Sequence, residues 1–132
     1  MRREDGTITV MTIGFFVFLG LLAVVVVNAS AAFLQRQQLD NVADGAALAA
    51  ADGLSREAFY RSGEVRLDDS EARRLVGRYV TGEGIRVVEI STEGDQVHVR
   101  LERTIGLPLT PPGWTSRTTI VADATAQLRR AD

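Results

Sequence analysis

The chain has 132 residues, of which 45% are hydrophobic, and its formal net charge at pH 7 is −2. Because so small a net charge creates no strong electrostatic field, we expect no nucleic-acid partner. The absence of cysteine excludes disulfides, thiol catalysis and zinc–thiolate sites.

The first element is an uncharged apolar run of 28 residues, from Thr7 to Leu34. A bilayer core about 30 Å thick needs only ~20 helical residues. We therefore predict a transmembrane helix over residues 7–34, preceded by a short segment over residues 1–6. An exported domain follows over residues 35–132.

The end of this run also resembles a signal-peptidase site, since Ala29 and Ala31 have small-x-small spacing. A secretory signal, however, has an apolar region of only about 7–15 residues. We therefore favour a retained anchor, with Asn28 and Ser30 either at the membrane interface or bonded to the backbone. A helix–helix contact in the membrane is the further alternative for these two residues.

Charge placement predicts the orientation of the anchor. Arg2 and Arg3 precede the apolar run, whereas only Arg36 follows it closely. Positive residues near a span favour the inner side of the membrane. We expect a single-pass protein of the cell membrane, with its N-terminus in the cytoplasm and residues 35–132 outside.

An alanine-rich polar helix is expected to continue from the apolar run, because no helix breaker precedes residue 44. It ends at Gly53 or continues to Tyr60. Apolar side chains recur in it at three- and four-residue spacing. We interpret one group of them as a low-profile surface that packs against partner helices: Leu39, Val42, Ala43, Ala46, Ala47 and Ala50.

A second, amphipathic helix is predicted after the acidic start Asp68-Asp69-Ser70-Glu71, whose residue types suit a helix N-terminus. The alternative, a cation site, is less favoured. The apolar stripe of this helix consists of Ala72, Leu75, Val76, Tyr79 and Val80, and Gly82 and Gly84 end it.

Three strands are predicted after Gly84, where the hydrophobic period becomes two. The first is residues 85–90, and the turn at residues 93–95 leads to the second, with Val97, Val99 and Leu101 facing inward. The third has a mostly small inward face that lets a helix lie close to the sheet: Ile120, Ala122, Ala124, Ala126 and Leu128. The predicted fold class is α+β, with two helices and a small three-stranded antiparallel sheet.

No residue pattern indicates catalysis. His98, the only histidine, falls on the polar face of its strand, which is typical of a solvated side chain, and the sequence offers it no triad or metal partners. We predict no catalytic residues, no metal, no cofactor and no small-molecule substrate. A membrane-anchored enzyme is the least favoured hypothesis, and an activity that requires His98 would revive it.

Trp114 lies on a connection with three prolines, residues 105–114. It is either a plug over the small core or an exposed contact point. We favour the plug.

The N-terminal third resembles the TadE/TadG-like proteins of tight-adherence (Tad, or Flp) pilus systems. The resemblance covers residues 2–54: Arg2-Arg3 with Gly6, the start at residues 7–10, the long apolar helix, a polar stretch at residues 35–38, and above all LDNVADGAALAAA at residues 39–51.

This resemblance implies a pilin-like fold and a structural role. The protein would be a minor pilin, a pseudopilin or a membrane-anchored assembly component, with other pilus or assembly proteins as partners. Gly6 is a possible processing site. Processed pilin precursors carry Glu five residues after the cut, whereas Met11 stands there in this chain. We therefore expect no cleavage after Gly6.

A single-pass envelope accessory or sensor protein unrelated to pili is the alternative function, because a span with a small domain is a common plan. Neighbouring genes for an ATPase, a membrane platform and a prepilin peptidase would favour the pilus hypothesis.

Overall fold

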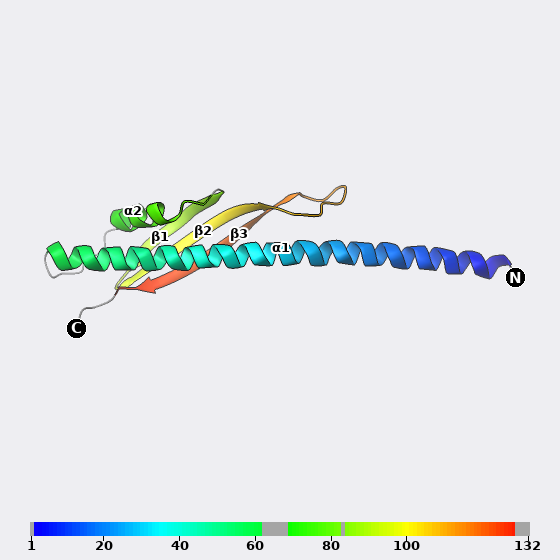
Figure 1. The fold of residues 1–132 in the computed structure, drawn as a ribbon, viewed down its shortest axis with the longest axis horizontal. Coiled ribbons are helices and arrows are strands. Elements are labelled where there is room, and N and C mark those ends of the chain that lie inside the picture. Colours follow the sequence, from blue (N-terminus) through cyan, green and yellow to red (C-terminus); the bar gives the residue numbers. More distant parts are fainter. Residues whose placement is uncertain (1, 62–68, 83, 129–132) are drawn as a thin grey trace.

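One long helix dominates the computed structural model, which describes residues 2–61, 69–82 and 84–128. Helix α1 (Arg2–Arg61) has 60 residues, which at 1.5 Å per residue makes it about 90 Å long. The other four elements lie along its C-terminal half only (Figure 1). The sequence allowed this helix to end at Gly53 or to continue to Tyr60. The structure shows the longer helix, which continues past Gly53 to Arg61.

Helix α2 (Asp69–Tyr79) packs against α1 and β1. Its predicted stripe is confirmed in large part: Ala72 and Val76 are completely buried, and Leu75 and Val80 are partly buried against the core. Tyr79 is the exception, with 48% of its surface exposed. Residue 68, expected at the start of this helix, lies outside the described residues.

The sheet has the strands β1 (Ile85–Glu93), β2 (Gln96–Gly106) and β3 (Arg117–Gln127). They form an antiparallel meander in the order β1-β2-β3. The predicted turn between β1 and β2 is confirmed, and Gly94 adopts a φ of 61° there, which glycine tolerates without a steric penalty. The α+β fold class is therefore confirmed.

A β-bulge interrupts the alternation of β1. The register with β2 shifts between Val87 and Glu89, so that Val88 has no Cα partner and is 50% exposed. This extra residue brings Ile90 onto the inner face, where it is buried.

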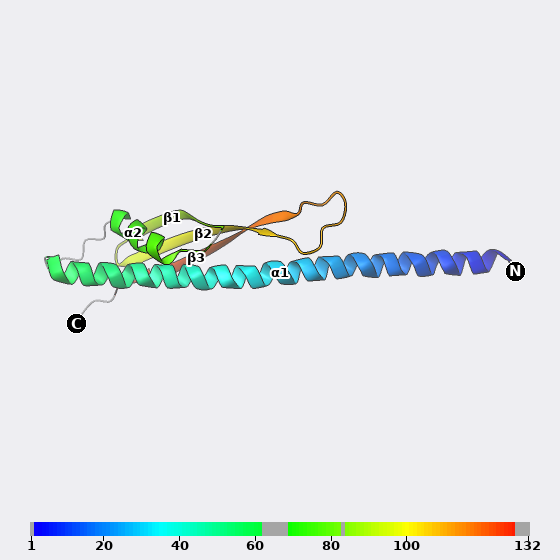
Figure 2. The same ribbon diagram turned by 45° about the horizontal axis from the view of Figure 1, so that its top comes forward.

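The core of the C-terminal half lies between the inner face of the sheet and the two helices (Figure 2). Helix α1 covers β2 and β3. The predicted inner faces are confirmed, because Val97, Val99 and Leu101 are completely buried and Ala122 and Ala124 nearly so. Alanines on both α1 and β3 keep the side chains between them short, and α1 therefore lies close to the sheet. We call the described part of the chain from Gln35 onward the head.

Two glycines of α1 mark its close contact with α2. A Cβ on Gly45 would lie 2.1 Å from Tyr79 Oη, and one on Gly53 would lie 2.6 Å from Leu75 Cδ1. Glycine inside a helix costs about 1 kcal/mol relative to alanine. The close approach of α2 leaves no room for a Cβ at these positions, which explains why both residues are glycine despite this cost.

Candidate membrane anchor and helix–head junction

The first half of α1 is an apolar surface that the rest of the described chain leaves uncovered. We call residues 8–27 the apolar segment; its 20 residues are about 30 Å long, which matches a bilayer core. Of its fifteen large apolar side chains, Val24 is partly buried and the other fourteen are at least 40% exposed: Ile8, Val10, Met11, Ile13, Phe15, Phe16, Val17, Phe18, Leu19, Leu21, Leu22, Val25, Val26 and Val27.

This exposure is too costly in water. Leaving one such side chain fully in water instead of burying it costs about 1.5–3 kcal/mol; these fourteen are 40–76% exposed, so together they cost on the order of 10–25 kcal/mol. Lipid or protein must therefore cover the apolar segment. Among the described residues, α1 alone is long and apolar enough to cross a membrane.

Asn28 joins the end of the apolar segment to the head. Its Nδ2 donates to the carbonyl oxygen of Leu109 at 2.6 Å, and its Oδ1 accepts from the Leu109 amide at 3.0 Å. Only 7% of Asn28 is exposed. The two bonds fix the orientation of the side-chain amide, because a flip would place donor against donor and acceptor against acceptor. Thus Asn28 ties α1 to a backbone 81 residues away.

The partner of Asn28 is a constrained loop between β2 and β3. We call residues 107–116 the β2–β3 loop. Its base is closed by a bond from the Leu107 amide to the Ser116 carbonyl at 2.8 Å, and its tip by one from the Trp114 amide to the Pro111 carbonyl at 3.1 Å. Gly113 has a φ of 88°. Proline and then glycine at the two central positions of residues 111–114 are typical of a type II turn.

The loop corrects one prediction. Trp114 does not plug the core, because it is 50% exposed and the loop lies beyond the end of the sheet (Figure 1). The physical reason is that the loop carries Trp114 past the end of the sheet, away from the core that alanines and aliphatic side chains form. Trp114 is exposed, as the alternative expected, and its role as a contact point stays a prediction.

The predicted partner-packing residues lie inside the head itself. Five of the six have at most 1% of their surfaces exposed: Leu39, Ala43, Ala46, Ala47 and Ala50. The remaining residue, Val42, is partly buried against the same core. The sheet and α2 are the neighbours of α1 here. Packing against a partner helix stays a prediction. The contacts within the head were missed because helical spacing shows that a face is apolar but not what covers it.

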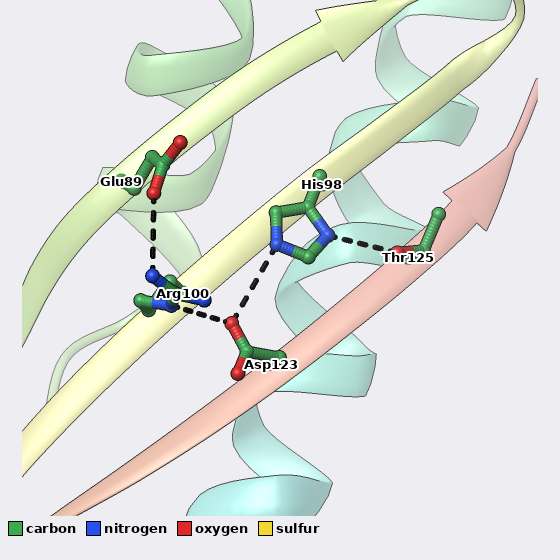
Figure 3. A network of polar contacts seen from close by, with 5 residues as sticks. All are labelled: Glu89, His98, Arg100, Asp123 and Thr125. Carbon is green, nitrogen blue, oxygen red and sulfur yellow. Dashed lines mark hydrogen bonds and ion pairs between the residues drawn. The ribbon is translucent and has the colours of Figure 1, made fainter.

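Polar side chains form a network on the outer face of the sheet (Figure 3). Arg100, on the central strand, donates from Nε to Asp123 Oδ1 at 2.7 Å and lies 3.6 Å from Glu89 through Nη1. His98 Nε2 lies 3.5 Å from the same Asp123 oxygen, and its Nδ1 lies 2.9 Å from Thr125 Oγ1. The network therefore joins all three strands.

The charges of this network shift two pKa values. The hydrogen bond from Arg100 is the main cause that holds the pKa of Asp123 below its usual 3.8; partial desolvation opposes it, and His98 adds to the lowering. The same hydrogen bond and the charge of Asp123 raise the pKa of Arg100. Both side chains are more than 40% exposed, and such exposed pairs contribute little to stability.

His98 has two neighbours that the sequence did not assign to it, Asp123 and Thr125. Acid, imidazole and hydroxyl are the group types of a catalytic triad, but triad chemistry also needs oxyanion donors aimed at a substrate and a concave site. This network lies on an exposed sheet face, and the carboxylate of Asp123 already accepts a hydrogen bond from Arg100. Within the described residues, no group of three or more His, Cys, Asp or Glu side chains could hold a metal ion. We interpret the network as a set of cross-strand polar contacts that links the three strands.

Comparison with known families identifies the N-terminal part of the chain. Residues 6–53 match the Tad family, described as "Putative Flp pilus-assembly TadE/G-like". This segment is TadE/TadG-like. The match confirms the resemblance and covers the apolar segment, Asn28 and the alanine-rich part of α1. No curated protein and no solved structure matches the chain. The family match and the apolar segment together support a pilus-related role and a location in the membrane.

Proposed function

We propose that the chain is a structural component of a Tad/Flp-type pilus or of its assembly machinery, and that it works through packing and not catalysis. One observation carries this proposal. The family match at residues 6–53 falls on a single helix that is uncovered and apolar in its first half and built into the head in its second. Such a helix suits a minor pilin, or an assembly protein that holds a small head at the membrane.

The proposed topology follows the charges and the apolar run. Residues 7–34 cross the membrane, the N-terminus lies in the cytoplasm and residues 35–132 lie outside. Arg2 and Arg3 support this orientation by the positive-inside rule.

Other pilus or assembly proteins are the proposed partners. The six small and aliphatic residues from Leu39 to Ala50 hold the helix in the head, so the same surface reaches a partner helix only if the head opens. The uncovered part of α1 is the better partner surface. Gly14 and Gly20 lie there, and a Cβ on either would meet nothing within 4 Å.

A C-terminal tag tests the proposal. Filaments are sheared from cells, and both the filament and the membrane fractions are probed for the protein and its length. Full-length protein in membranes supports an anchored assembly component, and a shortened protein in filaments supports a processed minor pilin. If deletion of the gene leaves filament number and length unchanged, the pilus role is wrong and an envelope accessory function gains support.

Processing after Gly6 needs its own variant. Gly6 lies within α1 and has open space around it, so Gly6→Val fits sterically. We expect both wild type and variant to keep their full length, because Met11 replaces the glutamate of processed pilins. A wild-type protein that is about six residues shorter than Gly6→Val would show cleavage. The control is Gly14→Val, which makes the same change deeper in the apolar segment.

A further inference from the structure

We propose that the β2–β3 loop is a second membrane contact. In this proposal Leu109 and Trp114 insert into the interfacial layer of the bilayer that α1 crosses, where lipid headgroups meet the acyl chains. The loop then fixes how the head is tilted and rotated on its anchor. The inference rests on the membrane insertion of α1, which is part of the proposed function, but not on the pilus role.

The level of the loop along α1 is the first argument. The apolar segment fills a hydrocarbon core about 30 Å thick and ends at Val27. Asn28 is the next residue, and its two hydrogen bonds hold Leu109 beside it. In both ribbon views the loop reaches beyond the sheet toward the N-terminal half of α1 (Figures 1 and 2). A loop fixed at this residue lies at the boundary between hydrocarbon and headgroups.

The composition of the loop is the second argument. Residues 104–116 contain no charged side chain. Leu109 is 41% exposed and Trp114 50% exposed. Tryptophan is enriched at membrane interfaces, where its ring meets apolar chains and its N–H meets polar groups. Arg103 and Arg117, the nearest charged residues on either side, are suited to phosphate headgroups.

The rigidity of the loop is the third argument. Pro108, Pro111 and Pro112 restrict the backbone, the type II turn closes the tip, and Asn28 holds the middle. Because the folded chain has already ordered these residues, insertion of Trp114 and Leu109 costs little further conformational entropy.

The only tryptophan of the chain makes the test direct. Full-length protein is reconstituted into phosphatidylcholine–phosphatidylglycerol vesicles that carry bromine at a shallow or a deep acyl position, and tryptophan emission is recorded. We expect emission shifted to the blue, stronger quenching by shallow than by deep bromine, and weak quenching by aqueous iodide. Red emission that iodide quenches would overturn the proposal. Blue emission that no brominated lipid quenches would also overturn it and indicate a protein partner, such as a second copy.

Two matched variants make the outcome decisive. Trp114→Phe combined with Phe18→Trp places the probe in the middle of the apolar segment, where deep bromine should quench it most. Trp114→Phe combined with Leu48→Trp places it on the outer face of α1 in the head, where Leu48 is 56% exposed and iodide should quench it. If the Phe18→Trp probe is not quenched by lipid, α1 is not inserted and the proposed function fails too. If that probe is quenched and Trp114 is not, only the loop proposal fails.

Discussion

Asn28 is the one buried polar side chain among the described residues. Its side-chain amide forms hydrogen bonds with both the carbonyl and the N–H of Leu109. One side chain therefore holds the helix and the loop together through two hydrogen bonds. Its place directly after the apolar segment makes it the residue at which anchor and head meet. A polar side chain there is as typical of a membrane interface as of a specific bond, so the sequence left both alternatives open.

Asn28→Ala should loosen the β2–β3 loop. The variant leaves the amide and carbonyl of Leu109 without partners, which costs about 1–3 kcal/mol. Amide hydrogen exchange of Leu109, measured by NMR on the full-length protein in micelles, should then become about 5- to 150-fold faster. Asn41→Ala removes an exposed asparagine of the same helix and is the control. Equal exchange rates in the two variants would mean that Asn28 does not hold the loop.

Asp123 gives the head a sensitivity to acid. Its pKa in the folded protein is lowered from 3.8, so its ion pair with Arg100 stabilises the fold above that value, and this contribution is lost as the pH falls through the lowered pKa. The thermal midpoint of wild type should therefore decrease more on acidification than that of Asp123→Asn. Glu93→Gln, a change at an exposed turn, should behave like wild type. The effect should be small, and parallel curves for wild type and Asp123→Asn would contradict it.

At the scale of the elements, small residues determine how closely α1 packs. Ala46 and Ala50 are completely buried between α1 and its neighbours, and Gly45 and Gly53 accept side chains of α2 at the same surface. The alanines of β3 complete this arrangement from the sheet side. The head core is therefore shallow, and a larger side chain in it would overpack the contact between α1 and its neighbours.

Ala46→Leu and Ala50→Leu should each destabilise the head. Overpacking a filled core costs about 1–3 kcal/mol, and for a domain of this size each kcal/mol lowers the thermal midpoint by about 4–8 °C. Circular dichroism of the full-length protein in micelles measures this midpoint. Asn41→Leu places the same side chain on the exposed face of α1 and should leave the midpoint nearly unchanged. If Ala46→Leu and Ala50→Leu matched this control, the alanine contact would not be close-packed.

The elements that the sequence predicted well are those with a local signal. The apolar run, the α2 stripe and the alternation from Val97 to Leu101 each have a period that one segment reveals. The contacts between Tyr79 and Gly45 and between Asn28 and Leu109 depend on which surfaces meet, and no local period encodes that. The exposure of Trp114 was mispredicted for the same reason, since it depends on where the β2–β3 loop lies relative to the core.

At the scale of the whole molecule, α1 joins the apolar segment to the head without a hinge, because one helix forms both the apolar segment and the wall of the core (Figure 1). Two contacts then set the orientation of the head: the alanine surface along α1, and the Asn28 bonds at its base. A pull or rotation applied to the anchor is therefore transmitted directly to the sheet. Such rigid coupling suits a structural component whose role depends on where its head is held.

The absence of cysteine allows the proposed topology to be tested with single-cysteine variants. Glu4→Cys lies before the apolar segment, and Glu93→Cys lies at the exposed β1–β2 turn. Because Arg2 and Arg3 favour the cytoplasm, an impermeant maleimide added to intact cells should label Glu93→Cys but not Glu4→Cys. Permeabilised cells should label both, which controls for reactivity. Labelling of Glu4→Cys alone in intact cells would invert the topology and place the head inside the cell. Labelling of neither residue in intact cells, with both labelled after permeabilisation, would mean that α1 does not cross the cell membrane.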